Sequence, residues 1–162
     1  MSIRITDSVD IDIAAPLIAK FRVELLGYKN TPAKEDIESA KKEFAEYIKA
    51  GYPIYLYMDG DEPLGYMVCR VVDDCVWVES LFVLPAHRRR GIATKLFSAA
   101  EELAASRGGD NLYNFVHPNN DDMIRFLNKR GYNVLNLLEI RRRDEGEKIT
   151  EQIKVRNNTF DY

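Results

Sequence analysis

The chain has 162 residues, of which 46% are hydrophobic and 30% charged, a balance typical of a globular domain with a substantial buried core. Its formal net charge of -3 argues against a nonspecific nucleic-acid binder, which needs a basic surface, so we expect no nucleic-acid partner. No stretch approaches the ~20 apolar residues of a membrane span, and the N-terminus lacks the pattern of a signal peptide, so the sequence predicts a cytoplasmic protein with no membrane partner.

The two cysteines indicate the redox state of the chain, and the lack of repeats indicates the number of domains. Cys69 and Cys75 lie in strand-like sequence, and two cysteines do not form a disulfide framework. We expect both to be reduced thiols and expect no metal site, because no second group of ligands is spaced near them. The sequence shows no internal repeat and no linker rich in Pro, Gly or Ser, so it predicts a single domain over residues 1–162.

The first fifty residues predict a strand followed by two helices. Residues 3–6 have strand character, and helical spacing of apolar residues occurs within 7–30 and within 34–50. Gly51 and Pro53 stand where a helix-ending glycine and a following proline belong. The apolar positions are Ile18, Phe21, Leu25 and Leu26 in the first helix, and Ile37, Phe44, Tyr47 and Ile48 in the second.

A block of strands comes next. We expect strands over residues 54–58, 64–72 and 76–84, separated by the turns Asp59-Gly60 and Asp73-Asp74. Strands joined by such short turns must be antiparallel.

The second half alternates helices with strands. We expect a helix over residues 91–107, a strand over 112–116, a helix over 120–130, and strands over 132–141 and 149–155. The apolar faces of these helices are Ile92, Leu96, Ala99, Ala100 and Leu103 in the first, and Ile124, Phe126 and Leu127 in the second. The predicted fold class is therefore α/β of the α+β type, with a mixed central sheet and helices on both faces.

The clearest chemical signal joins a predicted strand to a predicted helix. Residues 83–94 read VLPAHRRRGIAT, with three arginines followed by Gly91 and Ala93. The start of a helix leaves about four backbone N–H groups without partners, and these groups attract anions. The two small residues allow a diphosphate to approach the backbone. A solvated basic turn is the alternative, which the flanking elements disfavour. The Walker A pattern fits worse because the order is Thr94-Lys95 without a preceding glycine loop, and the Rossmann pattern because only one of its three glycines is present.

Two motifs resemble the GNAT superfamily of acetyl-CoA-dependent N-acetyltransferases. Residues 88–93, RRRGIA, resemble the signature Gln/Arg-x-x-Gly-x-Gly/Ala, and the preceding SLFV of residues 80–83 resembles the family's fourth strand. Pro118-Asn119-Asn120, then residues 124–127 and Gly131-Tyr132, are similar to the second signature. The resemblance covers residues 54–135 well and implies the GNAT fold, whose sheet is mixed and mostly antiparallel.

The resemblance also implies how acetyl-CoA would bind. Backbone N–H groups around Arg88 to Thr94 should hold its pyrophosphate, and the backbone of Leu81 to Val83 should pair with the pantetheine arm where the fourth and fifth strands separate. An N–H near Phe82 should stabilise charge on the thioester carbonyl. The implied cofactor-binding residues are Leu81, Phe82, Val83, Arg88, Arg89, Arg90, Gly91, Ile92, Ala93, Thr94, Asn120 and Leu127. Helix capping is an alternative role for Asn119 and Asn120.

Catalysis needs a base for the amine and a proton for the departing thiol. Glu79 is the candidate base because family members supply a carboxylate from this strand, although an exposed strand glutamate is the alternative. Glu24 and Glu46 are weaker candidates. The family's thiol-protonating tyrosine falls at Leu127, which cannot donate a proton. Tyr113, Tyr132, His117 or water are the possible substitutes.

The predicted function is direct transfer of the acetyl group of acetyl-CoA to a primary amine of a small molecule or a protein. The expected partners are acetyl-CoA, as cosubstrate without a metal, and an amine acceptor; a homodimer is left open. Two other functions remain as alternatives: a catalytically idle acyl-CoA-binding module and, less favoured, a nucleic-acid-binding domain.

Overall fold

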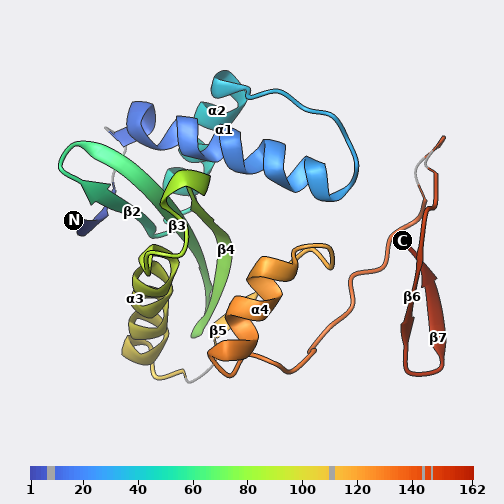
Figure 1. Cartoon of the computed structure of the whole chain (residues 1–162). Coiled ribbons are helices and arrows are strands. Elements are labelled where there is room, and N and C mark those ends of the chain that lie inside the picture. Colours follow the sequence, from blue (N-terminus) through green and yellow to red (C-terminus); the bar gives the residue numbers. More distant parts are fainter. Residues whose placement is uncertain (7–9, 110–111, 144, 147) are drawn as a thin grey trace. The chain divides into compact units, whose positions relative to one another are not determined.

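A computed structural model describes residues 1–6, 10–109, 112–143, 145–146 and 148–162, in two compact units, Met1–Phe126 and Leu127–Tyr162. In chain order the elements are β1 (Ser2–Ile5), α1 (Ile11–Tyr28), α2 (Ile37–Lys49), β2 (Ile54–Asp59), β3 (Glu62–Val72), β4 (Cys75–Val83), the 3-10 turn η2 (Pro85–His87), α3 (Ile92–Ser106), β5 (Leu112–Asn114), α4 (Asp121–Lys129), β6 (Gln152–Val155) and β7 (Asn158–Asp161) (Figure 1). None of the described helices is both long enough and apolar enough to cross a membrane.

The first unit is built on a five-stranded sheet of order β1-β2-β3-β4-β5. Neighbouring strands are antiparallel except β4 and β5, which are parallel. Helices α1 and α2 lie on one face of the sheet and α3 on the other (Figure 1). The predicted mixed, mostly antiparallel sheet with helices on both faces is therefore confirmed.

Coverage of both faces explains the burial pattern of the central strands. Every residue from Ile54 to Met58 in β2 is buried, without the alternation of a strand that has one face in water. On the α1 and α2 side, Leu56 and Tyr66 pack with Ile18 and Phe44 in the main hydrophobic cluster. Each such buried side chain contributes roughly 1.5–3 kcal/mol relative to an exposed one.

Two bulges interrupt the antiparallel pairs, and the second prepares the functional site. In the pairing of β3 with β4, Val68 lies opposite Ser80 while Cys69 lies opposite Val78, so Glu79 is the extra residue of β4. The pairing of β4 with β5 covers Val76 to Val78 and stops there. From the bulge onward β4 pairs with β3 and with no other described strand, and this is the region in which the resemblance implies a separation of the fourth and fifth strands.

Most helices and turns agree with the sequence-based expectations. The turns at Asp59-Gly60 and Asp73-Asp74 are present, and helices α2 and α3 end within a few residues of the expected positions. Asp36 caps α2 by accepting the N–H of Ser39. The start of the first expected helix includes residues 7–9, which lie outside the described residues.

The end of the chain differs from the prediction. The expected strand over residues 132–141 is wrong, because this segment has neither helix nor strand, and the strand expected over 149–155 begins only at Gln152. The second unit instead contains the hairpin of β6 and β7, which forms its own two-stranded sheet. Its turn consists of Arg156, at φ +54°, and Asn157, a typical turn residue that was the missed signal for this hairpin.

Candidate active site

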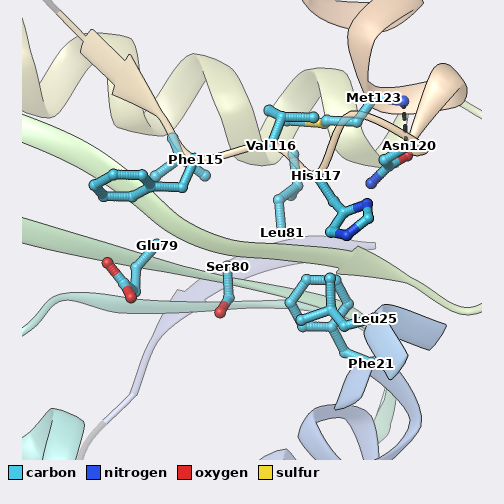
Figure 2. A pocket seen from close by; sticks show the side chains of 11 residues that line it. Phe21, Leu25, Glu79, Ser80, Leu81, Phe115, Val116, His117, Asn120 and Met123 are labelled. Atoms are coloured by element: carbon cyan, nitrogen blue, oxygen red, sulfur yellow. Dashed lines mark hydrogen bonds between the residues drawn. The ribbon is translucent and has the colours of Figure 1, made fainter. Parts of the chain in front are cut away.

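A pocket opens beside β4 where β5 leaves it (Figure 2). Its wall consists of Phe21 and Leu25 from α1, Val78 to Leu81 from β4, Phe115 to His117 after β5, and Asn120 and Met123 at the start of α4. Four separate parts of the chain thus converge around the bulge. Because the regular pairing of β4 ends at this bulge, the space beside the strand is left open here.

Glu79, the candidate base, lines this pocket. Its carboxylate Oε2 lies 3.6 Å from Nε of Arg70, and both side chains are about one-third exposed. The Arg70 guanidinium also lies over the rings of Trp77 and Phe115, at 5.1 and 5.2 Å from their centres. The two atoms are too far apart for a hydrogen bond, so Arg70 acts on the carboxylate through its charge alone. Sequence reasoning missed Arg70, because only the pairing of β3 with β4 brings it beside the bulge.

Two buried hydroxyl groups belong to this side of the pocket, one in its wall and one behind it. Ser80 lines the pocket, and Tyr66 is fully buried on β3; both hydroxyls lack a hydrogen-bond partner among the described residues. Burial raises the pKa of Tyr66 well above its usual value. An unpaired buried hydroxyl costs about 1–3 kcal/mol of stability.

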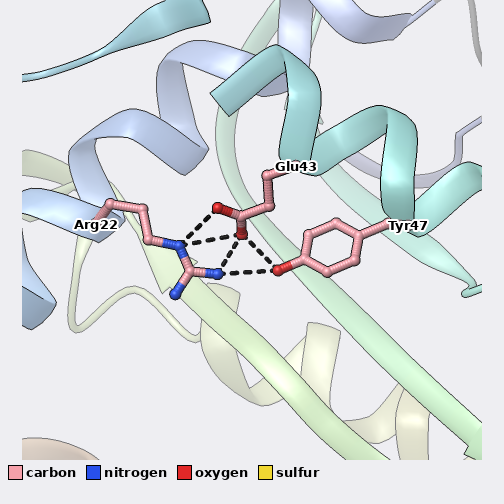
Figure 3. A network of polar contacts seen from close by, with 3 residues as sticks. All are labelled: Arg22, Glu43 and Tyr47. Atoms are coloured by element: carbon pink, nitrogen blue, oxygen red, sulfur yellow. Dashed lines mark hydrogen bonds and ion pairs between the residues drawn. The ribbon is translucent and has the colours of Figure 1, made fainter. Parts of the chain in front are cut away.

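A polar network supports the helices on this side of the sheet (Figure 3). Nε of Arg22 donates to both carboxylate oxygens of Glu43 at 3.0 and 2.8 Å, while the hydroxyl of Tyr47 donates to Oε1 at 2.5 Å. Burial acts to lower the pKa of Arg22, but the hydrogen bonds and charge of Glu43 outweigh it and raise that pKa above its usual value. The network ties α1 to α2 and so positions Phe21 and Leu25 at the pocket.

The loop before α3 has the geometry of an anion site. Gly91 precedes the helix at φ +79°, and a Cβ built there would meet no atom within 4 Å, so the space beside its backbone is open. The first intrahelical bond described is from Lys95 N–H to the Gly91 carbonyl, which leaves the N–H groups of residues 92–94 pointing out of the helix end. Arg89 and Arg90 are exposed, and Arg89 has φ +63°.

Arg88 points to α1 rather than away from the protein. Its Nε donates to the Val83 carbonyl at 2.9 Å, and its terminal nitrogen lies 2.5 Å from the carboxylate of Glu24. Tyr28 donates to the same carboxylate at 3.0 Å, and burial with the charge of Glu24 raises the pKa of Tyr28 to about 12. Glu24, a weak candidate for the base, thus connects α1 to the loop through Arg88.

The second motif begins α4 beside the pocket. The side chain of Asn120 accepts the N–H of Met123 at 3.1 Å, so capping, the alternative weighed for Asn120, is observed. Asn119 instead donates to the Tyr28 carbonyl at 2.9 Å. His117 stacks on Tyr28 with ring centres 5.8 Å apart, and burial, followed by the charge of Lys29, lowers the pKa of His117.

The remaining candidates fall in different environments. Leu127 is buried on α4, and its contact with a cofactor stays a prediction. Tyr113 stacks on Trp77 at 5.1 Å, as expected of a packed aromatic residue, whereas His117 faces the pocket. Glu46 is exposed on α2, away from the residues that line the pocket. Both cysteines are free thiols, as expected.

Comparison with known proteins agrees with this geometry. The model of the acetyltransferase (GNAT) family matches residues 21–132. The chain belongs to this family. A search of curated protein sequences finds no match to the chain.

Solved GNAT structures share the fold at low sequence identity. A possible acetyltransferase from Clostridium difficile 630 is 16% identical with a TM-score of 0.70, and the alignment covers 88% of this chain and 98% of that one. Aminoglycoside N-acetyltransferase AAC(6')-Iy in complex with CoA is 18% identical, with 88% and 99% covered and a TM-score of 0.67. Ribosomal-protein-alanine N-acetyltransferase from Brucella melitensis biovar Abortus 2308 is 17% identical, with 89% and 100% covered and a TM-score of 0.68.

Proposed function

We propose that this GNAT protein is an N-acetyltransferase that moves the acetyl group of acetyl-CoA directly to a primary amine of a small molecule or a protein. The observation that carries the proposal is the alignment of two features along β4. The strand leaves β5 at the Glu79 bulge, and a few residues later it leads into the open helix end at Gly91. Two of the similar solved structures carry the names of N-acetyltransferases: one is an aminoglycoside N-acetyltransferase and the other a ribosomal-protein-alanine N-acetyltransferase.

The residues around Gly91 fit the pyrophosphate of acetyl-CoA. The outward N–H groups of residues 92–94 and the positive end of α3 favour an anion, and the open space at Gly91 admits it. Arg89 and Arg90 add positive charge from exposed positions. When bound, acetyl-CoA supplies the activated acetyl group. Leu81 to Val83 of β4 pair with β3 on one side, and the edge that faces away from β3 offers backbone groups to its pantetheine arm.

Glu79 is the proposed base. A primary amine with a pKa near ~10.4 is mostly protonated at neutral pH, and it must lose a proton before it can attack. The Glu79 carboxylate lines the pocket on the wall shared with Ser80, within reach of an acceptor that enters there. The proton passes from the amine nitrogen to this carboxylate, directly or through one water.

The group that protonates the departing thiolate is either one of the chain's own residues or water. Leu127 occupies the motif position of the family tyrosine and has no proton to donate. Tyr113 packs on Trp77, while His117 lines the pocket, so His117 is the better candidate of these two. If His117 acts, His117→Gln should slow thiol release far more than Tyr113→Phe.

The test combines binding with turnover. Acetyl-CoA should raise the melting temperature, and a panel of primary amines, from aminoglycosides to peptides with free N-termini, should include acceptors that release free thiol from it. Binding without turnover across the panel would favour the idle acyl-CoA-binding module. Absence of any acetyl-CoA binding, together with salt-dependent binding of DNA or RNA, would favour a nucleic-acid-binding domain.

A further inference from the structure

Glu79 shares one end of the pocket with an arginine that the proposed mechanism does not use. Arg70 pairs with Trp77 across β3 and β4, and the bulge sets Glu79 beside its guanidinium, with Oε2 and Nε 3.6 Å apart. Phe115 lies at the same end of the pocket as Glu79 (Figure 2). All four residues belong to the first unit, so these contacts lie within one compact body. A carboxylate and a guanidinium therefore stand side by side at this end of the pocket.

Aromatic rings hold Arg70 in place. Its guanidinium carbon lies 5.1 Å from the ring centre of Trp77 and 5.2 Å from that of Phe115, and Trp77 in turn stacks on Tyr113. Cation–π contact of this kind fixes the plane of the guanidinium without using its N–H groups. Those N–H groups form a rigid fork that matches the two oxygens of a carboxylate. Arg70 is therefore prepared to bind an anion.

Neither charged group of this pair makes a hydrogen bond with a described residue. Nε of Arg70 and Oε2 of Glu79 are buried atoms without a partner, and their separation is too long for a hydrogen bond. Burial of charged groups that lack such bonds is unfavourable. Both side chains are about one-third exposed, which leaves part of each open to a ligand. A ligand that donates to the carboxylate and accepts from the guanidinium would satisfy both.

The charges of the pocket match a zwitterion. Glu79 is the only acidic residue among the described residues that line it, and the adjacent Arg70 balances that charge. A polycationic acceptor needs several carboxylates, whereas a molecule with one ammonium and one carboxylate needs one partner of each sign. The nitrogen and the nearest carboxylate oxygen of an α-amino acid lie roughly 3 Å apart. That spacing is close to the 3.6 Å between Oε2 and Nε.

We propose that the amine acceptor is an α-amino acid, whose ammonium group binds Glu79 and whose carboxylate binds Arg70; this rests on the proposed acetyltransferase function. The ammonium gives one proton to Glu79, and the neutral nitrogen forms a bond with the acetyl carbon as the carbon–sulfur bond breaks. The second proton of the nitrogen passes to the thiolate, and Glu79 releases the first to water. Arg70 is a specificity residue in this scheme, because it reads the carboxylate and takes no part in the proton transfers.

The first test compares matched acceptors on the unaltered protein. Thiol release from acetyl-CoA is measured with the standard L-amino acids, and for each active one with its carboxamide, which keeps the amine and lacks the negative charge. We expect kcat/KM to be about 10- to 100-fold lower for the carboxamide, because a charge-assisted hydrogen bond is lost. The amine of the carboxamide gives up its proton more readily, so protonation of the amine cannot explain a lower rate.

The second test moves the preference to Arg70. Arg70→Gln should lower kcat/KM for the amino acid and leave that for the carboxamide nearly unchanged, so the ratio of the two approaches one. A merely structural role would lower both equally. Arg107→Gln is the matched control: Arg107 is exposed at the C-terminal end of α3, the same charge is removed, and the ratio should stay as in the parent. Arg70→Lys, which keeps the charge without the fork, should retain part of the preference.

The outcomes separate this inference from the proposed function. If carboxamides, aminoglycosides or peptides with free N-termini react as well as the best amino acid, the carboxylate is not recognised and the inference is wrong, while acetyl transfer to amines stands. An unchanged ratio in Arg70→Gln would also overturn it. Thiol release with none of these amines would contradict the proposed function itself, and the inference would fall with it.

Discussion

The loop before α3 and the pocket beside β4 are assembled in opposite ways. The loop consists of consecutive residues, and the groups that we propose to bind the pyrophosphate are mainly backbone N–H groups around Gly91. The pocket consists of side chains from four separate segments, with Glu79 beside Arg70 on the neighbouring strand. A site built from consecutive residues is visible as a motif in the sequence, whereas a pocket of dispersed side chains depends on how strands and helices meet.

If the comparison holds, changes in the loop should affect acetyl-CoA binding, and changes in the pocket should affect turnover. The largest effect is expected for Gly91→Glu, which places bulk and negative charge at the proposed pyrophosphate site. At a ligand concentration of 100 times Kd, acetyl-CoA should stabilise the parent protein by about 2.7 kcal/mol and this variant hardly at all. A thermal shift assay measures both.

Gly60→Glu is the control for this change. Gly60 has φ +60°, and a Cβ there also meets no atom within 4 Å, so the backbone strain and the added charge are matched. This variant lies in the turn between β2 and β3 and should keep the full acetyl-CoA shift. Equal loss in both variants would show that strain, not the binding site, causes the effect.

Glu79→Gln tests the pocket. It keeps the shape of the side chain and removes the base, so we expect a rate loss on the order of 10²–10⁴ with acetyl-CoA affinity nearly unchanged. The loss should shrink as pH rises, because more of the acceptor amine is then already neutral. The pH–rate profile measures this, with Glu46→Gln on the exposed face of α2 as control. A profile identical to that of the parent would remove Glu79 from the mechanism.

Glu43→Gln tests the support of the pocket rather than its chemistry. It leaves the half-buried Arg22 without its carboxylate, and since both side chains keep some contact with water we expect a loss of about 1–3 kcal/mol in the free energy of unfolding. Urea unfolding measures it. Glu35→Gln, which breaks the exposed pair with Lys20, should cost less than about 1 kcal/mol. Equal losses would mean that the Arg22 network contributes no more than a surface pair.

The smallest effect is expected where the two regions meet. Glu24→Gln removes the carboxylate that holds Arg88, so Arg88 becomes available to an anion and acetyl-CoA affinity should rise about two- to five-fold at low salt. Isothermal titration calorimetry at two salt concentrations measures the change. Asp12→Asn, which removes an α1 carboxylate paired with Lys41, should leave the affinity unchanged. Weaker binding in Glu24→Gln would instead show that Glu24 positions Arg88 for the cofactor.

Much of the first unit could be predicted from the sequence. Helical spacing located α2 and α3, and the turn residues Asp59-Gly60 and Asp73-Asp74 located the hairpins. The end of the chain was predicted less well: the apolar run from Val134 to Ile140 has strand character but forms no strand, since a strand needs a partner strand as well as a local preference. Local preference cannot supply that partner.

The family and the position of the predicted cofactor loop could be inferred from sequence alone, because both depend on consecutive residues whose spacing is visible without a fold. The tertiary structure decided which side chains meet. It placed Glu79 at a bulge beside Arg70, turned Arg88 toward Glu24, and brought Phe21 and His117 to the same pocket. These contacts join residues far apart in the chain, and their geometry follows from strand register and helix packing, which no local pattern specifies.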